Sequence, residues 1–254
     1  MTLEICVDDV AGLDAAAAGG ADRIELCAAL GLGGLTPAPS LIAAARDSPL
    51  PVHMLVRPRA GDFRYDARSA AMIAADIAAS ADAGLAGVVI GASISGHMLD
   101  VALLARLVKH ARTLGEDRGS PLSLTLHRAF DLCPDLDAAL DAAIELGFDR
   151  VLTSGGTPRA IDGLTTLAAL HRRAAGRIVI LAGSGIDATN ASRFLDAGLR
   201  EIHASCGAPI DSILQSDDLR ERDFGFAMAG RRVTDATRVR NLKAVIDRFD
   251  RQPA

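Results

Sequence analysis

Ionisable and sulfur-bearing side chains recur at alternate positions of short apolar stretches in this sequence. In residues 122–127, leucines alternate with Ser123, Thr125 and His127, and Arg128 follows directly. A period of two is that of a β-strand, so the leucines share one face and the polar groups share the other. Hydroxyl, imidazole and guanidinium groups gathered at the end of a strand can bind an anion or transfer protons.

Thiol groups form a second chemical pattern. Cys6, Cys27 and Cys206 fall at or near the ends of three apolar stretches, and Cys133 lies in a predicted loop. Soft thiolates that lie close together are the ligands that Cu(I) selects, so the first three are candidate copper ligands. The alternative is that each cysteine is a small buried hydrophobe, because no CxxC motif fixes a ligand spacing. We expect reduced thiols rather than disulfides in a chain of this length.

Strand-like stretches separated by alanine-rich helical patterns must position these groups. The predicted strands span residues 3–7, 23–27, 52–56, 87–91, 122–127, 150–154, 178–182 and 201–205. Eight such units, with no GxGxxG after the first strand, favour a closed barrel over a doubly wound sheet. We therefore predict an α/β fold, a single-domain (β/α)8 TIM barrel over residues 1–254. Residues 207–234 are predicted as an irregular loop before the last helix, which runs from about Asp235 to Arg248.

Alternate strand residues of a closed barrel face its lumen, and the others pack against the helices. This rule gives the lumen a mostly polar set: Glu4, Cys6, Asp8, Arg23, Glu25, Cys27, His53, Leu55, Arg57, Ser123, Thr125, His127, Glu201, His203 and Ser205. Buried charges are costly unless they are paired. A salt-bridge lattice that fixes strand register is one interpretation. We favour a functional site for the cluster as a whole, because its polar residues gather toward the strand C-termini, where barrel active sites form.

Acidic and basic groups in this set define an enzymatic hypothesis. Glu4, Glu25 and His127 are candidate catalytic residues that exchange protons, and Arg57 would clamp an anionic substrate. Arg59, in the same loop as Arg57, is a candidate anion ligand. The alternative for Arg59 is an ordinary arginine of a surface loop.

A glycine-bearing turn supplies a candidate anion pocket. Gly183, Ser184 and Gly185 follow the seventh predicted strand, and Ser205 ends the eighth. Turns at these two positions that run into helix N-termini form the usual phosphate site of TIM barrels, which uses backbone N–H groups. The alternative is that the glycines only permit tight turns.

Composition argues against several classes of protein. A formal net charge of −5 and an aromatic content of 3% argue against nucleic-acid binding. The sequence shows neither a basic leader nor a run of about 18 apolar residues, so we expect no membrane association and a cytoplasmic location. The only lysines, Lys109 and Lys243, fall in predicted outer helices, which excludes Schiff-base chemistry in the lumen.

Seven sequence blocks, taken in order, resemble the signature of the CutC family. They are LEICVDDV at 3–10, GGADRIELCAAL at 19–30, GGLTP at 33–37, VRPRAGDFRY at 56–65, LHRAFD at 126–131, DRVLTSGG at 149–156 and EIHASC at 201–206. The sequence departs from the family pattern at Gly183, Ser184 and Gly185, where a glycine triplet is common. It also has Ala38 and Pro39 where Ser-Tyr is common.

This resemblance implies a cytosolic TIM barrel that binds Cu(I), is linked to copper homeostasis and assembles into a homodimer or homotetramer. An enzymatic role for the barrel mouth is also compatible with it. The positions that match the family motifs are Glu4, Cys6, Glu25, Cys27, Arg57, Arg59, Asp62, His127, Arg128, Asp131, Ser154, His203 and Ser205.

Three functions therefore stay open at the level of sequence. The first is a cytoplasmic CutC-like protein that binds Cu(I) through Cys6 and Cys27, with Cys206 as a third ligand. The second is a TIM-barrel enzyme that acts on a small phosphorylated or carboxylated substrate by acid/base chemistry without a Schiff base. The third is a scaffold without catalytic activity that assembles through its outer helices.

Overall fold

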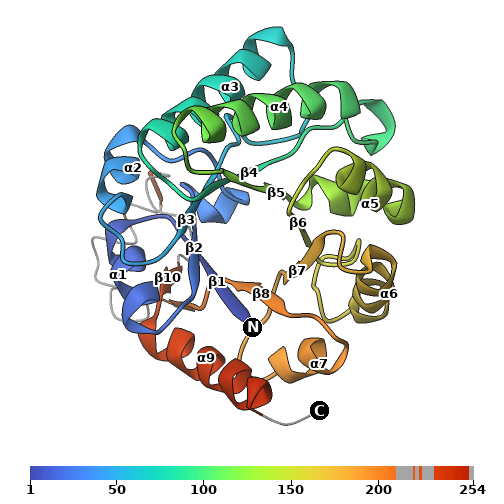
Figure 1. Cartoon of the computed structure of the whole chain (residues 1–254). Helices are drawn as coiled ribbons and strands as arrows, with labels where there is room; N and C mark the ends of the chain where they lie inside the picture. The colour runs from blue at the N-terminus through green and yellow to red at the C-terminus, as the bar shows by residue number, and fades with distance from the viewer. Residues whose placement is uncertain (210–219, 221–222, 225–231, 252–254) are drawn as a thin grey trace.

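Eight parallel strands close on themselves in the order β1 to β8, as the computed structural model in Figure 1 shows. The structure describes residues 1–209, 220, 223–224 and 232–251. The barrel strands are β1 (Thr2–Val7), β2 (Arg23–Leu26), β3 (Val52–Leu55), β4 (Gly87–Ile90), β5 (Ser123–Leu126), β6 (Arg150–Thr153), β7 (Val179–Gly183) and β8 (Glu201–Ala204). This topology confirms the predicted (β/α)8 barrel, and each strand end lies within one residue of its prediction.

Helices surround the barrel and cover the outer face of its strands (Figure 1). The α-helices are α1 (Val10–Ala18), α2 (Pro39–Ala45), α3 (Ala67–Asp82), α4 (Val101–Asp117), α5 (Leu136–Glu145), α6 (Leu164–Ala174), α7 (Ala191–Asp196) and α9 (Ala236–Asp250). Short 3-10 helices, η1 (Leu30–Leu32), η2 (Ser95–His97) and η3 (Arg128–Leu132), follow β2, β4 and β5. Within the described ranges, no helix combines the length and the apolar content needed to cross a membrane.

Aspartate residues mark the start of several of these helices. Asp9, Asp66, Asp100, Asp135 and Asp235 each accept a hydrogen bond, through a side-chain oxygen, from the N–H of the third helical residue. Their carboxylates also complement the positive end of the helix dipole. A single residue type thus sets where these helices begin.

The outward face of the strands supplies the hydrophobic core. Leu122, Leu124 and Leu126 are fully buried and belong to one core with Leu104 of α4 and Leu140 of α5. Burying a leucine side chain contributes about 2 kcal/mol to stability. The core therefore lies between the barrel and its helices, which leaves the lumen free for polar residues.

The segment 207–234 contains more regular structure than the irregular loop that the sequence predicts. Its two ends, β9 (Gly207–Pro209) and β10 (Arg232–Thr234), pair as antiparallel strands. Strands of three residues are too short to show an alternating pattern in the sequence. Residues 210–219, 221–222 and 225–231 lie outside the described part of the chain. The last helix, α9, begins directly after its N-cap Asp235, close to the predicted start.

Paired charges fill the lumen near the start of the strands. Arg23 binds Glu4 through Nε, and its Nη2 lies 2.6 Å from Glu201 Oε2. Arg150, which sequence reasoning missed, places its Nε 2.9 Å from the same Glu201 oxygen. Strand register brings Glu4 of β1 beside Arg23 of β2. This layer corresponds to the salt-bridge lattice considered above, and its pairs link β1, β2, β6 and β8.

Removing Arg23 should destabilise the barrel far more than removing an exposed arginine. Arg23→Ala leaves the Glu4 and Glu201 carboxylates short of a partner inside the lumen, which costs about 3–5 kcal/mol. Arg173→Ala on α6 is the matched control, because its acidic partners on α5 are exposed and such pairs contribute at most about 1 kcal/mol. Urea denaturation measures the free energy of unfolding of both variants. Equal losses would show that the lattice does not hold the barrel together.

Candidate functional site

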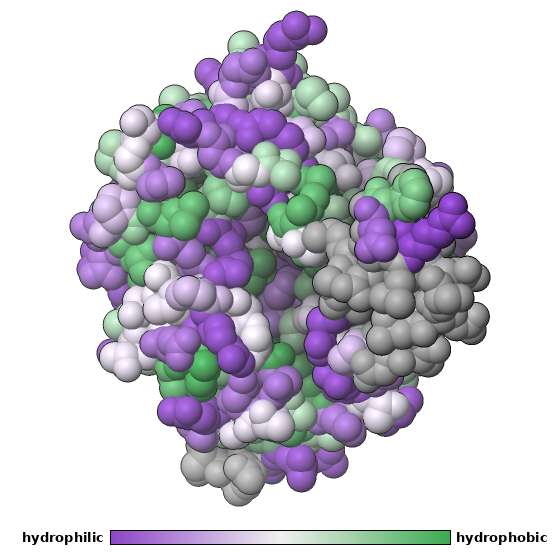
Figure 2. Space-filling model, turned by 180° about the vertical axis from the view of Figure 1, so that it is seen from behind, coloured by the Kyte–Doolittle hydropathy of each residue, from purple (hydrophilic) through white to green (hydrophobic). Residues whose placement is uncertain are grey.

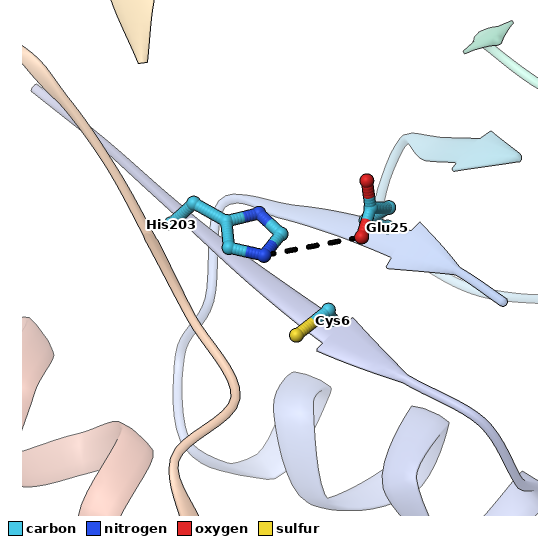
Figure 3. Close-up of side chains that lie close together, drawn as sticks. All are labelled: Cys6, Glu25 and His203. Atoms are coloured by element: carbon cyan, nitrogen blue, oxygen red, sulfur yellow. Dashed lines mark ion pairs between the residues drawn. The ribbon is translucent and has the colours of Figure 1, made fainter. Parts of the chain in front are cut away.

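Three side chains from neighbouring strands converge at the mouth of the barrel: Cys6 from β1, Glu25 from β2 and His203 from β8 (Figure 3). One thiol sulfur, one carboxylate oxygen and one ring nitrogen lie within 4.8 Å of one another, and all three residues are buried. The Nε2 atom of His203 is 3.9 Å from Glu25 Oε2. Among the residues that the structure describes, this is the group whose donors are spaced to hold a metal ion.

Strand register explains why these three side chains meet. Cys6 is the register partner of Glu25, and Glu4, two residues earlier on the same face of β1, is the partner of His203. Residues two apart on a strand point to the same side of the sheet. The group therefore forms only when β1 is paired with both β2 and β8, which requires the closed barrel.

Glu4 positions the ring of His203. The Nδ1 atom of His203 lies 2.7 Å from Glu4 Oε1, so its N–H donates to the carboxylate and Nε2 is left for the cluster. Burial favours a neutral Glu4, but Arg23 and His203 outweigh it and lower the pKa of Glu4 well below its usual range. A carboxylate that stays ionised cannot exchange protons near neutral pH. The contacts of Glu4 therefore favour a role in positioning His203 over the predicted role in proton exchange.

The pKa values of His203 and Glu25 are both raised. Burial opposes charge on the His203 ring, but its interactions with Cys6, Glu25 and Glu4 outweigh burial and raise the pKa of His203 well above its usual value. Burial raises the pKa of Glu25 to about 7, against the attraction of His203. Both groups can therefore hold a proton close to neutral pH, and a metal ion must displace protons to bind here.

The donor group fits copper(I) through two of its three members. Thiolate sulfur is a soft donor that selects Cu(I), and imidazole nitrogen suits copper, whereas a carboxylate oxygen suits harder ions. Metal-bound histidines usually donate their other ring N–H to a carboxylate, as His203 does to Glu4. Cys6 and His203 can therefore hold a copper(I) ion, with Glu25 as an adjacent charged group.

Cys27, predicted as a copper ligand, is not part of this group. Its Sγ donates to the carbonyl oxygen of Val7 at 3.4 Å, and its side chain packs against Leu55 and Val89. Burial raises the pKa of the Cys27 thiol far above its ordinary value. A metal ion would have to displace this thiol proton against the raised pKa, since the thiolate is the binding species.

Cys206, the predicted third ligand, also lies apart from the cluster. It lines a separate cavity of about 190 Å³ together with Arg238 and Asn241. Burial raises the pKa of the Cys206 thiol to about 12. Of the three predicted thiols, the group that could hold a metal ion therefore contains Cys6 alone, together with His203 and Glu25.

A second feature of the mouth is a cavity of about 220 Å³ beside the metal-type group. Figure 2, which shows the face opposite to that of Figure 1, has a hollow at its centre. Of the residues predicted for the site, the cavity is lined by Cys6, Glu25, Arg57, His127, Arg128, Ser184, Gly185, His203 and Ser205. The barrel thus brings most of the predicted site residues to one place.

Arg57 uses most of its donors to join two loops, which differs from the predicted role of binding an anionic substrate. Its Nη1 donates to the carbonyl oxygens of Leu32 and Gly34, and its Nη2 donates to Gly61 O, all at 2.9 Å. The guanidinium group thus joins the loop after β2 to the loop after β3. Its Nε has no hydrogen-bond partner in the described part of the chain, so one donor of this cavity-lining side chain stays open.

Arg59 is directed into its own loop and not into the cavity. Its Nη2 lies 2.7 Å from Asp62 Oδ1, and the Asp62 carboxylate also pairs with Arg64. All three side chains are exposed. The predicted role of Arg59 as an anion ligand is therefore not supported by its position.

The predicted phosphate turn differs from the usual barrel pattern. Gly183 ends β7, and Ser184 follows with a φ of 94° and donates its hydroxyl to Pro158 O. Helix α7 begins only at Ala191, and β9 follows Ser205, so neither turn runs directly into a helix N-terminus. Any anion here would therefore lack the help of a helix dipole.

Phe63 is a site residue that sequence reasoning missed. Its ring centroid lies 4.8 Å from that of His127, and the Arg57 guanidinium carbon lies 5.0 Å from the Phe63 centroid. A single aromatic residue in a polar loop has no periodic pattern to mark it. The available signal was its place between charged residues in the block at 56–65.

A metal-type donor group beside a cavity at the strand C-termini gives this TIM-barrel protein a candidate ligand site at its mouth. The chain belongs to the CutC family, because the family model with that description matches residues 1–208. A CutC family protein of Rhizobium meliloti (strain 1021) is 47% identical over 248 residues, which cover 97% of this chain and 96% of that protein. A CutC family protein of Caulobacter vibrioides (strain NA1000 / CB15N) is 51% identical over 209 residues, 82% of either chain.

A solved structure shares the fold. The crystal structure of a protein from Streptococcus agalactiae, named as a candidate copper homeostasis protein CutC, matches with a TM-score of 0.74. It is 27% identical to this chain, and the match covers 81% of this chain and 99% of that one. The family and the barrel fold predicted from the sequence are thus confirmed.

His127 should make the protein less stable in acid. Burial and repulsion from Arg57 lower the pKa of His127 from its ordinary 6.5 to about 3. Between pH 6.5 and about 3, His127 is protonated in the unfolded chain but stays neutral in the folded chain. Stability is therefore present above pH 6.5 and is lost as the pH falls toward 3, by about 2 kcal/mol at pH 5. His127→Asn should lose less stability than wild type on acidification, measured by urea denaturation at each pH.

His171→Asn on α6 is the matched control for this measurement. Its ring is only half-buried, so the acid loss of this variant should equal that of wild type. If His127→Asn and wild type lose the same free energy of unfolding between neutral pH and pH 5, the His127 ring is not held neutral by the fold.

Proposed function

We propose that this protein binds copper(I) at the barrel mouth and takes part in copper homeostasis, with Cys6 Sγ and His203 Nε2 as the ligands. The observation that carries the proposal is the meeting of a thiol, an imidazole and a carboxylate within 4.8 Å in a buried position. Copper would be the cargo of this site and not a resident cofactor.

Preorganisation supports copper binding. Glu4 already holds the His203 ring through Nδ1, so little ordering is left to do when a metal ion arrives. Cys6 is only 5% exposed and His203 8%, so an ion reaches them through the cavity and gives up its water there. A soft ion loses less by this exchange than a strongly hydrated one.

Glu25 supplies a proton acceptor beside the ligands. Copper binding needs a thiolate at Cys6 and a free Nε2 at His203, so it releases protons. The pKa of Glu25, about 7 because of burial, suits a group that takes up such a proton and passes it to solvent. Its carboxylate also balances the positive charge of the ion.

Family membership supports the same function. The Streptococcus agalactiae relative carries a name that refers to copper homeostasis, and this chain matches the family over nearly all of its barrel. A cytoplasmic location and assembly into a homodimer or homotetramer stay predictions of the sequence.

Competition with a chromogenic Cu(I) chelator tests the proposal. Wild-type protein should take up one copper ion per chain. Cys6→Ser and His203→Asn should each lower the affinity by more than about 100-fold, since loss of a residue that only orients a ligand costs about 10- to 100-fold. Glu4→Gln should fall within that smaller range. Circular dichroism establishes that each variant is folded.

Cys27→Ser and Cys206→Ser are the matched controls, because both remove a buried thiol outside the group. They should bind copper(I) like wild type. If Cys27→Ser abolishes binding while His203→Asn does not, the ligands are a pair of thiols and the assignment is wrong. A parallel titration with Zn²⁺, which suits a Cys, His and Glu set, contradicts a copper function if zinc displaces Cu(I) at equal concentration.

A further inference from the structure

Two buried donors in the cavity have no hydrogen-bond partner in the part of the chain that the structure describes. They are His127 Nε2 and Arg57 Nε. Both side chains line the cavity, and they are 5% and 7% exposed. An unsatisfied buried polar group costs about 1–3 kcal/mol, and native proteins rarely keep one without a reason. These two donors therefore point to a ligand.

His127 is a fixed neutral donor. The N–H of Ala129 donates to its Nδ1 at 3.1 Å. Since Nδ1 accepts, the single proton of the neutral ring is on Nε2, which is then a donor. Gly91 lies against the ring so closely that any added Cβ there would collide with it. The Phe63 ring packs on His127 with a centroid distance of 4.8 Å. The donor therefore cannot turn to another partner.

Arg57 brings an uncompensated positive charge to the same wall. Its Nη1 and Nη2 groups donate only to the carbonyl oxygens of Leu32, Gly34 and Gly61. Within the described residues it forms no ion pair with a carboxylate. A buried charge without a counter-charge is costly, and an anion in the cavity would relieve that cost. The charge of Arg57 already acts on His127, because it is one cause of the low pKa of that ring.

His127 lies across the barrel from the metal-type group, whereas Arg57 follows β3, the neighbour of β2. His127 follows β5, which is four strands from β1 in either direction around the closed barrel. Cys6, Glu25 and His203 come from β1, β2 and β8. Glu25, the one carboxylate among the described lining residues, is on β2, three strands from His127, and it forms no ion pair with Arg57 in the described part of the chain. The wall near His127 and Arg57 therefore favours negative charge.

We propose that this wall binds the oxyanion of a small organic ligand, a carboxylate or a phosphate, which accepts hydrogen bonds from His127 Nε2–H and Arg57 Nε–H. A cavity of about 220 Å³ limits the ligand to a small molecule. Leu30, Leu55, Phe63 and Leu152 supply an apolar lining for a short carbon skeleton. This inference goes beyond copper binding and does not depend on it, because it uses no residue of the metal-type group.

Calorimetric titration of metal-free protein, kept free of copper by a chelator, tests the proposal with two probes. Inorganic phosphate and malonate distinguish the phosphate from the carboxylate form of the ligand. At least one should bind with one site per chain and a Kd below about 1 mM. In wild-type protein labelled with ¹⁵N-histidine, that probe should shift the Nε2–H signal of His127.

Variants of His127 separate the donor from the fold. His127→Asn keeps a short side chain that can accept from Ala129 N–H but removes the deep donor, so binding should weaken at least about tenfold. His127→Gln keeps a donor near the depth of Nε2 and should bind more tightly than His127→Asn. His171→Asn on α6, an outer helix, should bind like wild type.

Three results would each overturn the proposal. Neither probe binds wild-type protein, or the probe that binds leaves the His127 Nε2–H signal unmoved, or His127→Asn binds as tightly as wild type. The labelled wild-type measurement decides the matter even if a variant fails to fold. A failure here leaves the copper assignment untouched, since that assignment depends on the response to Cys6→Ser and His203→Asn.

Discussion

One buried carboxylate holds this site together. Glu4 is 1% exposed and sits between Arg23 on β2 and His203 on β8. It is therefore bound from both neighbouring strands of β1, and both contacts exist only when the barrel is closed. Because Arg23 keeps it ionised, Glu4 can orient the His203 ring without sharing in the chemistry. The orientation of His203 at the barrel mouth therefore depends on the Glu4–Arg23 pair deeper in the lumen.

The lumen divides into two layers with opposite electrostatic character. Near the strand starts, Arg23 and Arg150 meet Glu201 in direct pairs, and the charges satisfy one another. Near the strand ends, the side chains of Arg57 and His127 keep donors without partners in the described chain. A folded protein tolerates such unpaired groups where they serve a ligand. The paired charges thus lie near the strand starts and the unpaired donors of the cavity lie near the strand ends, with Glu4 linking the paired layer to His203.

The strands and their two faces could be predicted from sequence periodicity, but the register between strands could not. The alternation of leucines with Ser123, Thr125 and His127 gave the strand and its two faces, because a period of two is visible in sequence. Which lumen residues touch depends on how β1 aligns with β8 across nearly the whole chain. No local sequence pattern contains that alignment. The sequence therefore predicts Cys27 as a metal ligand, whereas the structure places His203 beside Cys6. Loop conformation also could not be predicted from a local pattern. Arg59, predicted as an anion ligand, pairs instead with Asp62 of its own loop.

X-ray absorption at the copper edge of the Cu(I)-loaded protein addresses the central claim most directly. The claim is that barrel closure, through Glu4, sets one imidazole beside one thiol at the mouth. The spectrum should then show a single sulfur neighbour together with the multiple scattering of one histidine ring. Two sulfur neighbours and no histidine signal would contradict the claim and would show that two cysteines bind the copper ion.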